Sequence, residues 1–126
     1  MEVDLPGIRD EVAAAFARYE RALVSNDVAA LDALFRHDAR TIRYGGSENL
    51  YGIEEIRGFR QARSPAGLER RLARTVITTY GVTFATASTL FYRERLPGKV
   101  GRQTQSWVRF PEGWKIVAAH VSVIDE

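Results

Sequence analysis

The feature that most constrains the fold of this chain is its C-terminal segment, residues 101–122, which reads GRQTQSWVRFPEGWKIVAAHVS. Two strand-like runs flank Pro111-Glu112-Gly113, a short connection of turn-forming residues, so the segment predicts an antiparallel hairpin. Side chains alternate faces along a strand, and neither face of residues 116–123 carries a formal charge. We therefore expect this strand to be covered on both sides, with a polar-lined cavity on one of them.

Strict alternation divides the hairpin residues between two faces. One face of the second run would hold Trp114, Ile116, Ala118, His120 and Ser122, and the other Val117, Ala119, Val121 and Val123. Gln103, Gln105 and Trp107 share a face of the first run. The polar members of these sets are candidates for the cavity wall, and Val117, Val121 and Val123 for a dimer face.

Helical periodicity dominates the first third of the chain. Apolar residues recur at three- and four-residue spacing over residues 7–26, and Tyr19 is the only residue of that stripe with a polar tip. Asp27 can cap a short second helix over residues 28–35. A third helix is predicted over residues 53–63.

Strand-like composition fills most of the remainder. Residues 40–44 form a short β-branched and aromatic run, whereas residues 47–52 (SENLYG) are typical of a loop. Residues 68–80 and 82–95 predict two further long strands, rich in Thr, Val and aromatic residues.

These elements predict a single α+β domain spanning residues 1–126, in which a curved, mostly antiparallel sheet wraps around three N-terminal helices. Three helices can shield only one face of such a sheet. We therefore predict a homodimer formed through the outer sheet face.

Composition excludes several classes of function. The 126 residues include no cysteine, which removes disulfides and thiolate sites. The net charge of +2 comes from scattered basic residues, so nucleic-acid binding is not expected. No apolar run is long enough to cross a membrane and no leader peptide is visible, so a cytoplasmic protein is the expectation. The two histidines, His37 and His120, lack the spacing of a metal site, and no metal or cofactor is predicted.

Several polar residues have both a structural and a functional interpretation. Tyr19 could be a core residue whose hydroxyl bonds a backbone carbonyl, or a proton donor in the cavity. Arg43 could lie on an exposed strand face. If it is buried, its charge needs an anion, which could be a ligand carboxylate or the nearby Glu48. Arg60 and Arg63 could be solvated at the end of the third helix, or one of them could reach the cavity mouth.

Certain segments carry a family resemblance. The closing pattern Gly113-Trp114 followed by a strand ending in His120-x-Ser122 resembles the nuclear-transport-factor-2-like, or SnoaL-like, cone-shaped α+β barrels. The segments TIRYGGSEN, FRQAR, TVITTYG and GRQTQSWVR, joined to GWKIVAAHVS, are similar to the AtzH-like group within that superfamily. This group of cofactor-free proteins is linked to the breakdown of cyanuric acid and related ureides.

The resemblance implies a lyase that decarboxylates 1,3-dicarboxyurea to allophanate, with a catalytic tyrosine on the first helix and a catalytic arginine on the first strand. These positions match Tyr19 and Arg43. On this interpretation Arg43 binds the carboxylate of a small anionic substrate and Tyr19 supplies a proton. The rest of the predicted substrate-binding wall is Gln103, Gln105, Trp107, His120, Arg60, Glu48 and Ser122.

Two alternatives remain open. One is an amidohydrolase acting on a related, oxalurate-type ureide, although Ser122 beside His120 lacks the GxSxG motif of a nucleophile elbow. The other is a non-catalytic protein that binds small anions on the same fold.

Overall fold

The computed structural model describes all 126 residues, which form three helices and six strands. In chain order these are α1 (Pro6–Val24), α2 (Val28–Leu34), β1 (Ile42–Tyr44), β2 (Asn49–Tyr51), α3 (Ile53–Ala62), β3 (Arg71–Tyr80), β4 (Phe84–Tyr92), β5 (Lys99–Phe110) and β6 (Gly113–Asp125).

The helices form where the apolar spacing predicts them. Pro6 begins α1, and Asn26 leaves the helical conformation with a φ of 52° just after its end. The side chain of Asp27 accepts a hydrogen bond from the backbone N–H of Ala30, which caps α2 as expected. None of the helices is both long and apolar enough to cross a membrane.

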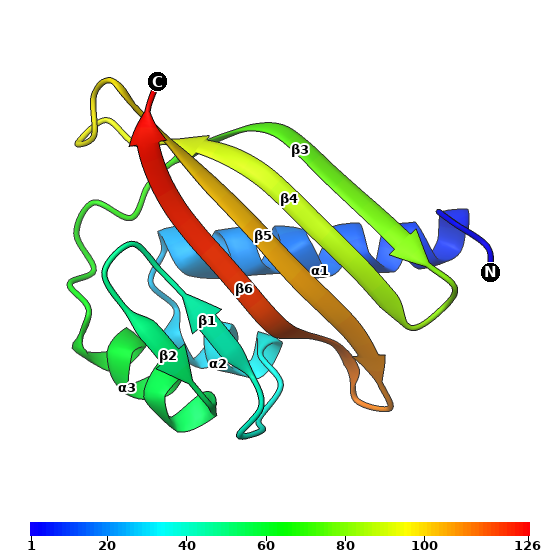
Figure 1. Cartoon of the computed structure of the whole chain (residues 1–126). Helices are drawn as coiled ribbons and strands as arrows, with labels where there is room; N and C mark the ends of the chain where they lie inside the picture. The colour runs from blue at the N-terminus through cyan, green and yellow to red at the C-terminus, as the bar shows by residue number, and fades with distance from the viewer.

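The strands form one sheet in the order β2-β1-β6-β5-β4-β3 (Figure 1). Neighbouring strands are antiparallel except β1 and β6, which run parallel. The prediction of a loop at residues 47–52 is wrong in part, because residues 49–51 form β2 and pair with β1. Cross-strand pairing gives these polar residues hydrogen-bond partners that their composition does not reveal.

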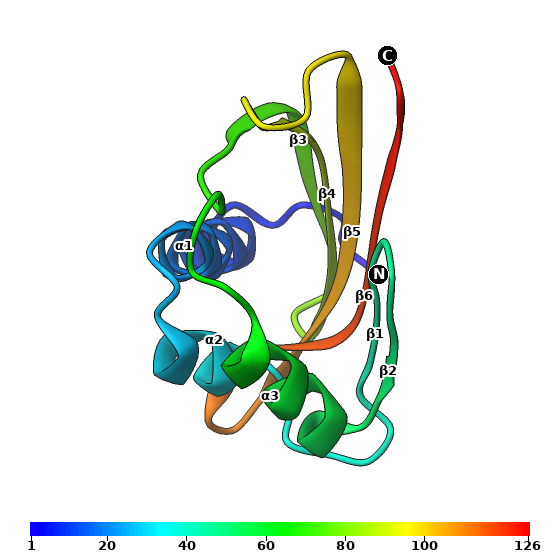
Figure 2. The same cartoon turned by 90° about the vertical axis from the view of Figure 1, so that its left-hand side faces the viewer.

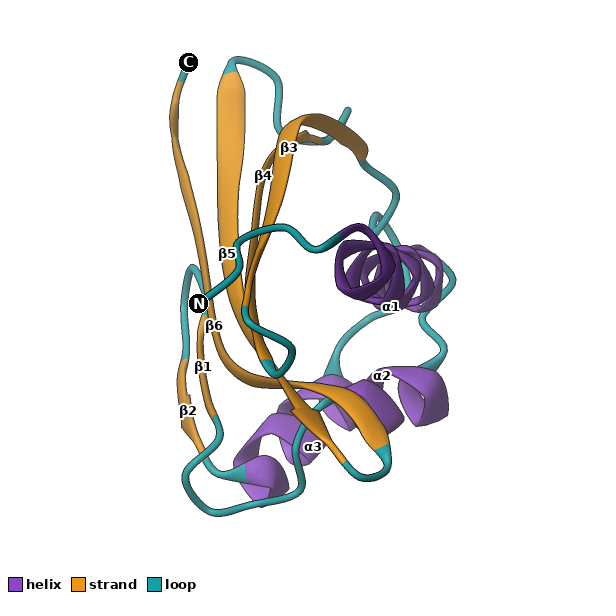
Figure 3. Cartoon of the chain, turned by 90° about the vertical axis from the view of Figure 1, so that its right-hand side faces the viewer, coloured by secondary structure: helices purple, strands orange, loops and turns teal.

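All three helices lie on the same side of the curved sheet, with α2 and α3 below α1 (Figures 2 and 3). Helix α1 crosses behind the long strands in the view of Figure 1. The core lies between these layers; its largest fully buried side chains include Trp107, Phe35 and Phe91. This arrangement confirms the predicted α+β class with a curved sheet around N-terminal helices. The other face of the sheet has no helix over it, and the homodimer through that face stays a prediction.

A β-bulge in β6 overturns part of the predicted face assignment. Ser106 pairs with Ala118 but Trp107 pairs with Ile116, so Val117 is an extra residue on β6. One extra residue reverses which side chains face the helices beyond it. Ala119 is consequently buried with Ile116, whereas His120 is exposed on the outer face.

The placement of His120 and Ser122 in the cavity is therefore wrong. His120 packs edge-on against Tyr44, with 6.0 Å between ring centroids, and Ser122 accepts a hydrogen bond from Arg102 Nε at 3.2 Å. The same bulge turns Val121, which pairs with the inward-facing Gln103, toward the helices and away from the predicted dimer face.

Candidate functional site

Helix α1 carries Tyr19 into the space between the helices and the sheet. Tyr19 is 3% exposed, and its ring lies 6.3 Å from that of Phe35. Its hydroxyl is close enough to Arg60 to affect that residue's pKa. This position would let the phenol contact a ligand bound near Arg60.

Strand β1 turns Arg43 inward, because Arg43 pairs with the buried Ala119 of β6. Its Nη1 donates a hydrogen bond to Glu48 Oε1 at 2.9 Å, and both side chains are largely buried. Burial opposes ionisation of Glu48, but hydrogen bonds from Ser47 and Arg43 outweigh it and lower the Glu48 pKa. The structural pairing with Glu48 thus exists, and it occupies one of the guanidinium nitrogens of Arg43.

The glycine at position 45 makes this pair possible. A Cβ at Gly45 would lie 1.7 Å from Glu48 Oε1, so any larger residue would displace the carboxylate from Arg43. The tight loop between β1 and β2 therefore fixes Glu48 beside the inward-facing arginine.

Arg60 does not lie in solvent at the end of α3, as one interpretation of the sequence predicts. It is 3% exposed, and its guanidinium carbon lies 4.4 Å from the centroid of the Phe35 ring. Its Nη1 is buried with no hydrogen-bond partner. Burial lowers the pKa of Arg60 to about 10; the Tyr19 hydroxyl opposes this shift, and the charge of Arg43 adds to it. Arg60 is a buried cation with no paired anion.

Arg63, at the C-terminal end of α3, continues the same arrangement. Its Nε and Nη2 are buried without partners. Burial lowers its pKa, and the charge of Arg43 lowers it further, whereas Tyr19 and Glu48 oppose the shift. Arg63 therefore lies within electrostatic reach of the groups that surround Arg60.

Two glutamine side chains on β5 form another part of the site. Each amide is oriented by a nitrogen that can donate a hydrogen bond but cannot accept one. Trp107 Nε1 donates to Gln105 Oε1 at 3.1 Å, and Arg70 Nη2 donates to Gln103 Oε1 at 2.9 Å. Each amide oxygen is thus occupied, and each Nε2 is buried without a partner. Trp107, 0% exposed, acts on the site through Gln105.

Arg70 and Glu20 belong to this site although the sequence pattern does not reveal them. Arg70 Nε and Nη2 bind the two carboxylate oxygens of Glu20 at 2.9 and 2.7 Å, and the Arg70 side chain is 1% exposed. The two residues are separated by 50 positions, and Glu20 lies beside the apolar stripe of α1. Only the packing of α1 against the sheet brings them together.

The site residues named above hold five buried side-chain atoms without a hydrogen-bond partner. All five are N–H donors: Arg60 Nη1, Arg63 Nε and Nη2, Gln103 Nε2 and Gln105 Nε2. The acidic groups that act on this site, Glu48, Glu20 and Asp32, are already bound to arginines. An unpaired buried donor costs free energy, so several together favour a ligand with several acceptor oxygens, such as a carboxylate. We call this set, with Tyr19 and Arg43, the donor cluster.

Comparison with known proteins identifies the family. The model of the AtzH-like family matches residues 1–126. The chain belongs to the AtzH-like family. No curated protein sequence is significantly similar to it.

Solved structures of similar proteins agree with this membership. A protein of unknown function from Pectobacterium atrosepticum is 60% identical, with a TM-score of 0.95 over 98% of this chain and 95% of that one. A cystatin-like fold protein from Burkholderia xenovorans is 52% identical, with a TM-score of 0.96 over 100% and 98%. A nuclear-transport-factor-2-like protein from Salmonella enterica, 22% identical with a TM-score of 0.76 over 95% and 93%, shares the fold.

Proposed function

We propose that this AtzH-like protein is a cofactor-free carboxy-lyase that removes carbon dioxide from a small N-carboxy ureide such as 1,3-dicarboxyurea. The observation that carries the proposal is the donor cluster, which combines five unpaired buried N–H groups with the Tyr19 phenol, while the carboxylates of Glu48 and Glu20 are bound to arginines. Such a wall favours a substrate rich in acceptor oxygens and negative charge.

The reaction needs few catalytic groups. The bond between the carboxylate carbon and the nitrogen breaks, carbon dioxide leaves, and the bonding electrons remain on the nitrogen. That nitrogen then takes a proton, which the Tyr19 hydroxyl supplies and recovers from solvent. Overall, one dicarboxyurea dianion and one proton give one allophanate and one carbon dioxide.

The arginines have separate roles in this scheme. Arg43, already oriented by Glu48, binds and positions the substrate carboxylate with its remaining donors. Arg60, whose charge interacts with the Tyr19 hydroxyl, stabilises the transient phenolate. Gln103 and Gln105 donate hydrogen bonds to the carbonyl and carboxylate oxygens, because their own oxygens are already engaged.

The two alternatives receive less support. An amidohydrolase needs a base that activates water, but Glu48 and Glu20 are ion-paired and His120 is exposed on the outer sheet face. A protein that only binds anions would need the N–H donors of the donor cluster but not the phenol of Tyr19. The Tyr19 phenol, buried and within electrostatic reach of Arg60, favours catalysis over this second alternative.

Turnover of 1,3-dicarboxyurea, followed as carbon dioxide release, tests the proposal. We expect Tyr19→Phe and Arg43→Ala each to lower kcat/KM by more than about tenfold, since each group acts in the transition state. Carboxylate binding that needs Arg43 but not the phenol, without product, would identify a binding protein. Release of ammonia in place of carbon dioxide would identify an amidohydrolase, and unchanged turnover in both variants would refute the assignment.

A further inference from the structure

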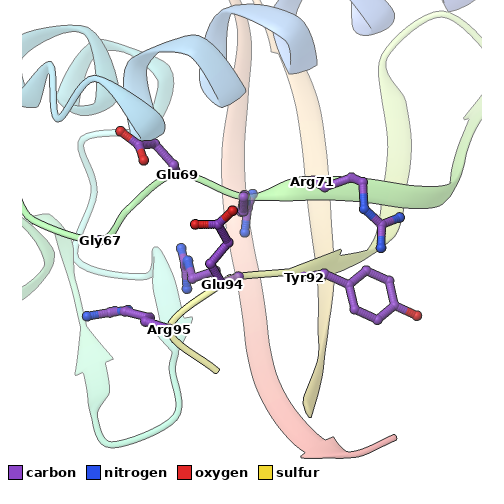
Figure 4. Close-up of a pocket in the computed structure, with 8 residues that line it drawn as sticks. Gly67, Glu69, Arg71, Tyr92, Glu94 and Arg95 are labelled. Atoms are coloured by element: carbon purple, nitrogen blue, oxygen red, sulfur yellow. The ribbon is translucent and has the colours of Figure 1, made fainter. Parts of the chain in front are cut away.

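A pocket lies beside the donor cluster, at the end of the sheet where β3 begins and β4 ends. It has a volume of about 630 Å³. Figure 4 shows Arg95 at one end of it, and Arg71 with Tyr92 at the other. The lining residues are Gly67, Glu69, Arg70, Arg71, Tyr92, Arg93, Glu94 and Arg95. We call this cavity the entrance pocket.

Arg93 is the residue of this pocket whose charge is least compensated. Its Nε is buried with no hydrogen-bond partner, and no carboxylate forms an ion pair with it. Burial lowers the pKa of Arg93 to about 10, the charges of Arg70, Arg95 and Arg63 lower it further, and Glu20 opposes the shift. A partly buried cation close to other cations is stabilised by an anion.

Aromatic and glycine residues hold these arginines in place. The guanidinium carbons of Arg70 and Arg93 lie 4.6 and 5.0 Å from the centroid of the same Phe91 ring. The Arg95 side chain lies against Gly67, where an added Cβ would approach its Cδ to 2.8 Å. Gly67 also has a φ of 72°, a backbone conformation that favours glycine. Both this conformation and the contact with Arg95 therefore disfavour a larger residue at position 67.

The entrance pocket is continuous with the donor cluster through two arginines. Arg70 lines the pocket and also donates to Gln103, whose free Nε2 belongs to the cluster. The charge of Arg63 acts on Arg93, and Arg43 and Tyr19 act on Arg63 in turn. Two donors of Arg63 are buried without a partner.

We propose that the entrance pocket is a second carboxylate-binding site, in which Arg93 and Arg95 capture an incoming small anion before it passes Arg63 to the donor cluster. The inference extends the proposed function, since it concerns the approach of the same class of ligand. A positively charged pocket next to a site raises the local concentration of an anion and its association rate.

Malonate, a small dicarboxylate, is the probe. Labelled protein is titrated while NaCl holds the ionic strength constant, and nitrogen–proton correlation spectra are recorded. The backbone amides of Gly67 and Arg95 report on the entrance pocket, and the Gln105 side-chain amide reports on the donor cluster. We expect malonate to cause saturable chemical-shift changes both in the amides of the entrance pocket and in the Gln105 amide of the donor cluster. NaCl alone, at the same ionic strength, should not reproduce them.

Variants separate the two sites. Arg93→Gln should weaken malonate binding at Gly67 by about tenfold, as expected for one lost charge-assisted hydrogen bond. Arg95→Gln, an exposed change, should slow the association measured at Gln105 by at least about threefold. Arg9→Gln removes the same charge from an exposed site on the first turns of α1 and should change neither value.

The outcomes distinguish this inference from the proposed function. Absence of a saturable shift at Gly67 while Gln105 responds would overturn the inference and leave the donor cluster intact. Equal effects of Arg95→Gln and Arg9→Gln on association would also overturn it, because the effect would then be one of net charge. A response at Gly67 without one at Gln105 would support the pocket and contradict the proposed function.

Discussion

Replacing Arg60 by methionine should stabilise the protein and at the same time weaken its binding of carboxylates. Arg60 is buried on α3, packs on Phe35 and has one nitrogen without a partner. Methionine preserves most of the aliphatic contact with Phe35 and removes the charge. The substitution therefore separates the cost of the buried cation from the packing of its side chain.

The magnitude follows from the pKa of Arg60. Burial lowers this pKa from the usual value of an arginine to about 10, which corresponds to roughly 3 kcal/mol of unfavourable free energy for the charged form. Loss of the cation–π contact with Phe35 offsets about 1 kcal/mol of this. We expect Arg60→Met to raise the free energy of unfolding by about 1–2 kcal/mol in the absence of ligand.

The sign of the pH dependence follows from the same shift. Below pH 10 Arg60 is protonated in both the folded and unfolded states, so its cost is constant. Above pH 10 the folded state releases its proton before the unfolded state does, so the wild-type protein gains stability as the pH rises towards the usual pKa of an arginine. The advantage of Arg60→Met should therefore be uniform from pH 5 to 9.

Urea unfolding with and without malonate measures both effects. Arg57→Met is the matched control, because Arg57 lies one turn earlier on α3 and pairs with Asp32 and Glu54. This control should lose about 1 kcal/mol or less of stability and keep malonate binding. A loss of stability in Arg60→Met larger than that of Arg57→Met would refute the view that Arg60 is an uncompensated cation.

Two further substitutions test the supports of the site. Gly101→Ala should lower the free energy of unfolding by about 1–3 kcal/mol, as measured by thermal or urea unfolding. The added Cβ would lie 2.1 Å from the ring of Phe91, on which the guanidinium groups of Arg70 and Arg93 pack. A Cβ added at Gly58 on α3 would have no atom within 4 Å, so Gly58→Ala should instead stabilise the protein by about 0.5–1 kcal/mol. Equal changes in the unfolding free energy of the two variants would contradict this account. Trp107→Phe removes the hydrogen bond to the amide oxygen of Gln105 and should weaken malonate binding several-fold, as measured by calorimetry. Trp114→Phe removes a hydrogen bond to Glu11 and should leave malonate binding unchanged.

The sequence was sufficient for the fold because the fold depends on repeating patterns. Apolar spacing identifies α1 and α3, and dense β-branched runs identify the long strands. The single extra residue at Val117 has no such signature, and it reverses every side chain after it. For that reason the inward positions of Gln103 and Gln105 could be predicted from β5, whereas the outward position of His120 on β6 could not.

The electrostatic part of the site was less predictable for a different reason. Arg60 lies where a helix end commonly meets solvent, and only the packing of α3 against Phe35 buries it. The Glu20–Arg70 pair depends on contacts between segments 50 residues apart. Local patterns report the conformation of a segment, but the partners of a buried charge are set by tertiary packing.

The donor cluster should discriminate between ligands because its unpaired nitrogen atoms can only donate hydrogen bonds. A carboxylate presents only acceptor oxygens, but an amide presents its own N–H groups to donors such as Gln105 Nε2 and Arg60 Nη1, and leaves them unpaired. An unpaired buried donor costs about 1–3 kcal/mol, so the half-amide malonamate should bind about tenfold or more weakly than malonate. Calorimetric titration of both ligands measures the ratio. Equal affinities would mean that one of the glutamine amides rotates to accept, and that Trp107 and Arg70 do not fix their orientation.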